Sequence, residues 1–339
     1  MLRQALSATA PLLILAGLWL GFAVAIALGD PESPRPWDFL SYRTTATILV
    51  QTATVAVAAC GMTLVIAIGG IDLAVGSVLA LACVVMALGL GQGWHPALAG
   101  LLALGAGAAC GLVSGGLVAG ARLMPFIVTL GMLGAARGAA KLAAGSQSVT
   151  YDNAAFPWFE SLMTPVAMPG EASLLGSLAH DPLRVVAPGV WVAVAMVAAT
   201  TVVLRWTVFG RHALALGSNP AAARLCGVRC RMLTVAVYVL CGATAAMAGI
   251  LETARIHVGD PTTAPGRELD VIAAVVIGGA SLSGGRGSAI GAAIGALMMT
   301  VLRTGAQRMG WDPAWQEVII GAVIVAAIAL DRMRQQTRT

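Results

Sequence analysis

Long apolar stretches, separated by short polar breaks, run through most of this chain. A helix needs about 20 apolar residues to cross a bilayer, and uncharged stretches of that length recur along the sequence. One of them, 73–121, is divided in two by the turn-forming residues 91–96. The expected crossings are 10–28, 44–71, 73–91, 96–121, 125–144, 185–204, 232–251, 269–282, 287–302 and 314–330. This pattern predicts an all-α polytopic membrane protein with about ten transmembrane helices, of which some are broken and 269–282 is too short to span alone.

The polar segments between these stretches predict how the chain is organised. We expect a single transmembrane domain over 1–339, in which the first helix is retained rather than cleaved after Ala23-Val24-Ala25. Residues 145–184 contain four acidic residues and four prolines, and they predict an aqueous outer loop with a short interfacial helix. Residues 205–231 contain five arginines before the next apolar stretch. Because basic residues favour the cytoplasmic side, we expect this connector and both termini to be cytoplasmic.

Composition excludes most other classes of protein. The chain is 58% hydrophobic and 10% charged, with a mean hydropathy of +0.87, whereas soluble domains are about 25% charged. No phosphate-binding loop, nucleophile elbow or zinc-protease motif is present, so we expect a protein that is not an enzyme. Cys226 and Cys230 are close together, but only His212 is near them, and we expect no metal site. Active transport would therefore draw its energy from another chain or from an ion gradient.

Small residues spaced four apart mark the segment 105–120, including Gly107, Gly111 and Gly115. Such spacing lets two helix backbones approach closely. Tight packing within the bundle is the expected role, and a helix that lines a polar pathway is the alternative.

Two glycine pairs, Gly69-Gly70 and Gly278-Gly279, interrupt apolar stretches and are followed by similar residues. They indicate helix breaks, which membrane proteins tolerate where the break lines a cavity or packs against protein. The likeness of the two breaks is explained by chance or by a shared turn type rather than by an internal repeat. Asp72 follows the first break, and we expect it to cap the next helix at the cytoplasmic surface. A buried proton relay is the alternative, although no further buried acid is evident.

The sequence of the connector predicts a short helix with signals at both of its ends. Asn219 is a good N-cap, Pro220 suits the first helical position, and Gly227 suits the C-terminal stop. A stiff, basic surface helix of this kind could bind a partner protein or lie on anionic lipid. The residues alone leave these two roles open.

Four motifs resemble those of ribose-type ABC importer permeases, in the superfamily of branched-chain amino acid and sugar permeases. They occur in the expected order and cover the chain from about residue 44. The motifs are Gly61-Met62-Thr63-Leu64-Val65-Ile66 leading into Gly69–Ser77, then Pro125–Gly131 followed by Arg137-Gly138, then Gly217–Gly227, and finally Glu268–Gly279 continuing through Ser281 to Gly287.

The resemblance implies a permease subunit that imports a monosaccharide across the bacterial inner membrane by alternating access. It implies a second permease chain, a periplasmic sugar-binding protein and a cytoplasmic ATPase that binds ATP and magnesium, with no cofactor in this chain. The implied ATPase-coupling residues are Asn219, Pro220, Ala221, Arg224, Leu225 and Gly227. Candidate path or gate residues are Gly69, Gly70, Asp72, Ser77, Thr129, Glu268, Asp270, Gly278, Gly279 and Ser281.

This chain departs from the family pattern at three positions. Ala221 stands where the family usually has Glu, which removes an ion pair to the ATPase, and Met124 and Ala280 replace a Pro and a Thr. A branched-chain amino acid permease of the same architecture and an ion-coupled secondary carrier are the alternative functions. A purely structural membrane protein is a third, and the polar breaks argue against it.

Overall fold

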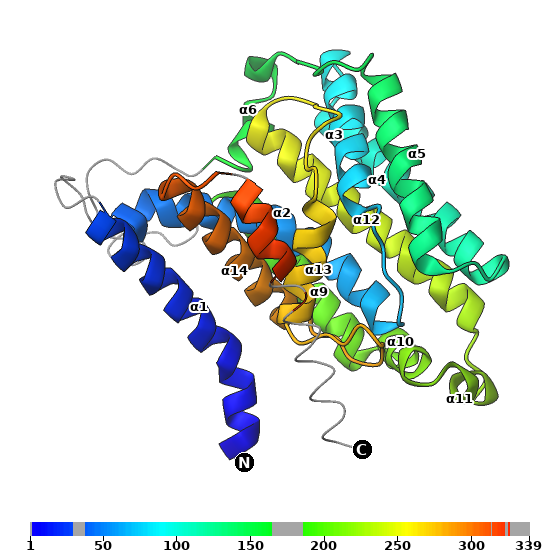
Figure 1. The fold of residues 1–339 in the computed structure, drawn as a ribbon. Helices are drawn as coiled ribbons and strands as arrows, with labels where there is room; N and C mark the ends of the chain where they lie inside the picture. The colour runs from blue at the N-terminus through cyan, green and yellow to red at the C-terminus, as the bar shows by residue number, and fades with distance from the viewer. Residues whose placement is uncertain (1, 30–37, 165–185, 313, 323–324, 326–339) are drawn as a thin grey trace.

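The computed structural model describes residues 2–29, 38–164, 186–312, 314–322 and 325, and within them it shows a bundle of helices (Figure 1). The described ranges contain no strand beyond a single isolated bridge between Val149 and Gly259. The α-helices are α1 (Leu2–Gly29), α2 (Tyr42–Ala67), α3 (Val75–Gly91), α4 (Pro96–Gly120), α5 (Pro125–Ala143), α6 (Pro157–Ser161), α9 (Pro188–Trp206), α10 (Val208–Ser218), α11 (Pro220–Leu225), α12 (Cys230–Ile256), α13 (Arg267–Ile277) and α14 (Ala289–Arg308). Two short 3₁₀ turns, Asp38–Leu40 and Asn153–Ala155, precede α2 and α6, and residues 314–322 are also helical.

Seven helices in the described ranges are long and apolar enough to cross a membrane: α1, α2, α4, α5, α9, α12 and α14. The apolar helix α3 is shorter, with 17 residues, and α13 has only 11. At 1.5 Å per residue α13 covers about 16 Å, against a hydrocarbon core of about 30 Å. The prediction of an all-α polytopic membrane protein is confirmed, and so is the short eighth segment. The count of ten crossings stays a prediction, because part of 314–330 lies outside the described residues.

Helices α2 and α12 form the centre of the bundle (Figure 1). In α2, 89% of the most apolar 18-residue segment is buried, whereas the corresponding share is 22% in α5 and in α9. Gly61 lets α2 approach α12, because a Cβ at Gly61 would lie 2.7 Å from the Cα of Cys241. The outer helices leave leucines and valines exposed, as expected where the surrounding solvent is lipid rather than water.

Glycines spaced four apart bring α4 against α12. A Cβ at Gly111 would overlap the carbonyl oxygen of Tyr238, and one at Gly115 would lie 2.9 Å from the Cα of Val235. At Gly107 the added atom would overlap the carbonyl oxygen of Gly242. The expectation that these small residues serve helix packing is confirmed.

The turns between helices agree with the prediction, but some helix ends do not. The turn at 91–96 separates α3 from α4, and Pro125 opens α5 as expected. The helix predicted to end at Leu251 continues to Ile256 in α12, and α14 also extends beyond its predicted end at 302. Glu252, which the apolar pattern left outside the span, is therefore a buried helical residue. Its neighbour Arg255 balances its charge within the same helix, which a hydropathy pattern does not register.

The bundle has two distinct ends. The connector end holds α10, α11, the C-terminus of α2 and the α13–α14 turn, where Gly285 N–H donates to the Ala67 carbonyl at 2.9 Å. The opposite end holds residues 145–164 and the C-terminus of α12, joined by the Val149–Gly259 bridge. Of the predicted outer loop, residues 165–184 lie outside the described residues, and 157–161 form the expected short helix α6.

Candidate coupling surface and transport path

The short helix α11 has the ends that its sequence predicts. The Asn219 side chain accepts hydrogen bonds from the N–H groups of Ala221 and Ala222 at 3.1 and 3.0 Å, and Pro220 occupies the first turn. Gly227 has a φ of +81°, and its N–H bonds to the Arg224 carbonyl at 3.0 Å. This closing turn is a left-handed glycine cap. The capping prediction is confirmed, although the helix itself covers only Pro220–Leu225.

One face of α11 is anchored and the other is free. Ala223 is buried, whereas Leu225 is 91% exposed and Ala221 and Arg224 are also exposed. Arg224 donates from Nε to the Pro220 carbonyl at 3.1 Å, which leaves the outer nitrogens of its guanidinium available. A rigid helix that offers an arginine and a fully exposed leucine has the character of a docking surface.

Helix α10, which the sequence did not predict, carries the connector into the bundle. Thr207 caps its start by accepting from Gly210 N–H at 3.2 Å, and Ala213 and Leu216 are buried on one face. Its last turn ends at Gly217 and Ser218, directly before the Asn219 cap. The alternation of apolar and polar residues along 208–218 could have indicated this helix, but the pattern is short and lies among arginines.

Three stretches of backbone meet at Gly217, and we call this contact the glycine junction. It consists of Gly217 at the end of α10, Ala67 and Gly69 at the end of α2, and Gly284 and Gly285 between α13 and α14. A Cβ at Gly217 would overlap the Ala67 carbonyl and lie 2.5 Å from the nitrogen of Gly285. A Cβ at Gly284 would lie 2.7 Å from the Gly217 carbonyl and 3.0 Å from the Gly69 Cα. The connector therefore touches both turns directly, with no side chain between them.

The two glycine breaks share one turn type. Gly69 and Gly279 have φ values of +81° and +94°. In each turn the next residue donates back into the helix, Gly70 to Val65 and Ala280 to Val275, at 2.9 and 3.1 Å. The two ends match the Schellman motif, so a shared turn type is confirmed.

An alignment of the two turns by conformation is shifted by one residue from their alignment by sequence. Gly69 corresponds in conformation to Gly279, whereas the sequence aligned it with Gly278. Gly278 has φ −66° and serves a different purpose. A Cβ there would lie 2.5 Å from the nitrogen of Ala292, so Gly278 lets α13 and α14 pack closely.

A non-helical segment, 68–74, links α2 to α3 inside the protein. The Ile71 carbonyl accepts from Thr129 on α5 at 3.3 Å and from the Tyr238 hydroxyl on α12 at 3.5 Å. Thr129 is fully buried, and it contacts the segment at Ile71, the residue after Gly70. The inner part of the broken backbone is tolerated because neighbouring helices supply hydrogen-bond donors to it.

Asp72 lies within this buried segment. Its carboxylate accepts from the Ala74 N–H at 2.9 Å, and only 4% of the residue is exposed. The prediction that Asp72 is an N-cap at the surface is wrong, because α3 begins at Val75 and its N-cap position is Ala74. The carboxylate still satisfies a backbone donor, but it does so inside the bundle.

Further into the bundle, Glu268 on α13 lies against Gly76, the neighbour of Ser77 in the first turn of α3. A Cβ at Gly76 would overlap the Glu268 carboxylate, which places Glu268 against the first turn of α3. Ser77 is fully buried, and neither its hydroxyl nor Glu268 Oε2 has a hydrogen-bond partner. Ser281, by contrast, lies near the glycine junction, and its hydroxyl is 2.8 Å from that of Ser283.

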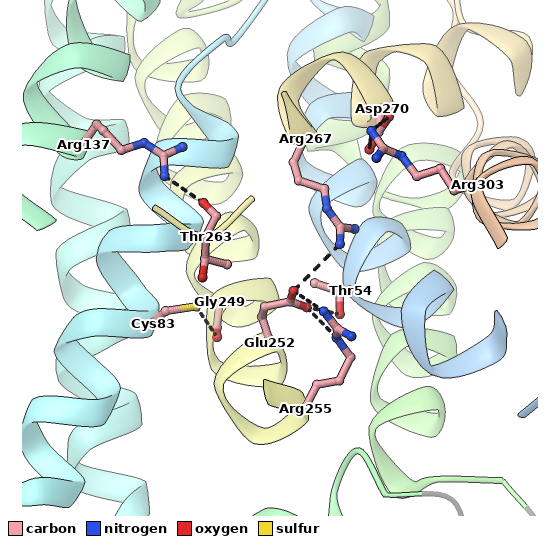
Figure 2. Close-up of polar contacts among 10 residues, drawn as sticks. All are labelled: Thr54, Cys83, Arg137, Gly249, Glu252, Arg255, Thr263, Arg267, Asp270 and Arg303. Carbon is pink, nitrogen blue, oxygen red and sulfur yellow. Dashed lines mark hydrogen bonds and ion pairs between the residues drawn. The ribbon is translucent and has the colours of Figure 1, made fainter. Parts of the chain in front are cut away.

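Arginine–carboxylate pairs, which the sequence did not predict, stabilise the half of the bundle away from the connector (Figure 2). Glu252 is 3% exposed and receives two hydrogen bonds from Arg255, at 2.6 and 3.1 Å. It also accepts from Thr54 on α2 at 3.3 Å and lies 3.8 Å from Arg267 on α13. Three helices therefore meet at one carboxylate. The expectation that no acid beyond Asp72 is buried is wrong.

A second pair joins α13 to α14. Asp270 is 1% exposed and lies 2.8 Å from Arg303. The sequence offered Asp270 as a gate residue, and the structure gives it a partner that holds two helices together. Arg137 on α5 donates to the carbonyls of Pro261 and Thr263 at 3.0 and 2.7 Å, and Figure 2 shows the bond to Thr263. The loop before α13 is thereby tied to α5.

The loop at the opposite end packs on α12. Glu160 lies 3.6 Å from His257, which ends α12 in the left-handed conformation. Tyr151 is half-buried there, and burial, reinforced by the negative charge of Glu160, raises the pKa of its hydroxyl to about 12.

Within the described residues no group of three potential metal ligands is gathered, and Cys226 and Cys230 are free thiols in the connector.

Comparison with known proteins places the chain in a family. Residues 44–328 match the model of the "Branched-chain amino acid transport system / permease component" family. The ribose import permease of Escherichia coli (strain K12) is 38% identical over 320 residues, which is 93% of each chain. The fructose import permease of Rhizobium meliloti is 36% identical over 96% of this chain and 85% of its own. The galactofuranose transporter permease of Escherichia coli (strain K12) is 37% identical over 85% of this chain and 79% of its own.

The polytopic helical bundle, together with these matches, defines a permease subunit of a membrane transporter. The chain belongs to the family of permease components named above, and it is a multi-pass protein of the inner membrane. No solved structure matches it.

Proposed function

We propose that this chain is the membrane-spanning permease of an ATP-driven importer that carries a monosaccharide. The relatives named for transport of ribose, fructose and galactofuranose support this class of substrate, because permeases for three different sugars are all similar to this chain over most of its length. The half-buried Glu268 and the buried Ser77 supply polar atoms without partners, which suit a path for a hydroxylated solute. These two residues are our candidates for the transport path.

The proposed partners follow from the connector. A separate cytoplasmic ATPase binds ATP and magnesium and docks on α11, a second permease chain completes the path, and a periplasmic sugar-binding protein delivers the substrate. The connector and both termini face the cytoplasm in this arrangement. The exposed Leu225 and Arg224 support docking, and Ala221 leaves that contact without the carboxylate usual in the family.

The single observation that carries the mechanism is the glycine junction. A displacement of α11 reaches Gly217 through α10, and Gly217 presses on the ends of α2 and of the α13–α14 turn. Because backbone contacts backbone, little of the motion is absorbed by side-chain rotation. Closure of the ATPase pair on ATP would shift both turns together and alternate the access of the path, with hydrolysis occurring in the partner rather than in this chain.

Reconstitution with a partner ATPase and a sugar-binding protein tests the proposal. Proteoliposomes should accumulate a monosaccharide only when ATP and magnesium reach the ATPase. Uptake of leucine with no sugar uptake would instead establish a branched-chain amino acid permease. Accumulation by the purified chain on an imposed proton or sodium gradient would establish an ion-coupled carrier, and Asp72 would then be the first residue to examine.

The docking role of α11 has its own test. Arg224→Glu reverses a charge on the exposed face, so we expect weaker retention of the ATPase in a pull-down and a proportional loss of uptake. Arg43→Glu is the control, because Arg43 is also exposed but lies at the start of α2, at the opposite end of the bundle. Normal ATPase binding and uptake by Arg224→Glu would remove Arg224 from the coupling surface.

Thiol labelling tests the orientation. In a background without Cys226, a cysteine at Glu160 should react with an impermeant reagent added outside, and one at Ser218 should not. The reverse pattern would overturn the proposed topology.

A further inference from the structure

A basic hollow lies where α11 joins α12, beside the last turn of α4. Its volume is about 570 Å³, and four arginines contribute to its lining: Arg122, Arg224, Arg229 and Arg231. No acidic residue is among the residues that line it. Three of the arginines lie within 224–231, and the fold brings Arg122, from the end of α4, against this basic run.

The charge in this hollow is not neutralised by the protein. All four arginines are exposed, and none of the ion pairs among the described residues involves them. Helix α12 begins at Cys230 in the same place, and its N-cap residue Arg229 makes no side-chain cap hydrogen bond. The positive end of the helix dipole therefore adds to the field of the arginines. An anion bound here would meet several donors and no competing acceptor.

The hollow lies at the boundary between lipid and water. Ala119 and Arg122 are at the end of α4, and Cys230 is at the start of α12, and both helices are long enough to cross a membrane. Beside them Leu117, Leu123 and Met124 expose apolar surface. Positive charge at the ends of membrane-spanning helices suits the depth of lipid phosphates.

We propose that this hollow binds the phosphate of an anionic phospholipid, whose acyl chains lie along the exposed faces of α4 and α5. Basic pockets between spanning helices suit such headgroups, and each arginine near the surface adds to the attraction. The bound lipid rests against both the α4–α5 turn and the connector, so it stabilises the position from which α11 docks.

Lipid titration of the purified full-length chain in zwitterionic detergent tests the proposal. Phosphatidylglycerol should raise the melting temperature in a saturable manner, and phosphatidylcholine should not. In Arg122→Gln/Arg231→Gln we expect the apparent affinity for phosphatidylglycerol to fall about thirtyfold. Arg205→Gln/Arg211→Gln is the matched control, because it also removes two exposed arginines near the same end but outside the hollow. Arg122→Lys/Arg231→Lys preserves charge and should retain most of the affinity.

Four outcomes would overturn the proposal. Equal losses in the two glutamine doubles would indicate diffuse attraction to the surface. Inorganic phosphate that produces the same stabilisation at millimolar concentration would assign the hollow to a soluble anion. Unchanged lipid affinity with lost ATPase binding would assign it to the ATPase. A lysine double that melts normally but no longer responds to phosphatidylglycerol would exclude charge as the basis of binding. Arg224 is left intact in every variant, so failure here is distinct from failure of the docking role of α11.

Discussion

The two ends of the bundle are held together by different physical means. At the connector end, three backbones touch at the glycine junction, and the contact depends on the absence of side chains. In the other half, arginine pairs with Glu252 and Asp270 join α12, α13 and α14, and the contact depends on charge (Figure 2). Steric contact transmits displacement with little slack, whereas long side chains in an ion pair can rotate and remain paired. The first arrangement suits a moving end and the second suits a hinge.

A single methyl group at the junction should have the largest effect. Gly217→Ala places a Cβ over the Ala67 carbonyl, so α10 must move away from both turns. We expect uptake to fall by at least tenfold while ATP hydrolysis by the assembled importer persists, because the ATPase still docks on α11. The measurement is the ratio of sugar transported to ATP hydrolysed.

The matched control is Gly116→Ala. Gly116 is a helical glycine of α4 with open space where a Cβ would be, and alanine there should preserve uptake. An unchanged transport ratio in Gly217→Ala would show that the junction does not carry the motion.

Removing one partner of a buried ion pair should lower the stability of the protein and leave the ratio of sugar transported to ATP hydrolysed unchanged. Asp270→Asn leaves Arg303 without its counter-charge, and such changes cost about 3–5 kcal/mol. We expect a lower melting temperature in detergent and an unchanged ratio of sugar to ATP in the protein that remains folded. The double variant Asp270→Asn/Arg303→Gln should recover part of the loss. A double that is less stable than the single would contradict the pairing.

The cap of α11 should have a smaller effect. Asn219→Ala removes two hydrogen bonds to backbone N–H groups, which costs about 1 kcal/mol of local helix stability. Amide exchange in 220–225 should quicken, ATPase affinity should fall by a few fold, and the crossing helices should exchange as before. Asn219→Asp retains an acceptor and should behave like the wild type. Equal exchange in the alanine and aspartate variants would argue against capping.

The exposed pair Arg308–Asp38 should matter least. The two groups are 2.9 Å apart but partly open to solvent, and such pairs contribute about 0–1 kcal/mol. Arg308→Gln should shift the melting temperature only slightly, and by less at high salt. A loss as large as that of Asp270→Asn would show that exposure does not separate the two pairs.

Local features of this protein could be predicted from the sequence, and long-range ones could not. The caps at Asn219 and Gly227 depend on neighbouring residues, so their chemistry was visible in the order of the residues. The glycine junction joins Ala67, Gly217 and Gly285, which are distant in the chain, and each glycine alone suggested only a break. Asp72 was misplaced because a turn and a buried non-helical segment have the same composition. Glu252 was misplaced because Arg255 neutralises it only in the folded helix.

The C-terminal residue that caps α11 carries a reactive group that can be labelled. Cys226 is the C-cap of that helix and is the exposed member of six free cysteines, of which Cys60, Cys83 and Cys241 are buried. An alkylating reagent therefore finds a native thiol at the edge of the proposed docking surface. The rate at which this thiol reacts should fall when the ATPase covers α11 and recover when the two separate. The wild-type chain thus carries its own reporter of assembly, and association can be followed without introducing a label.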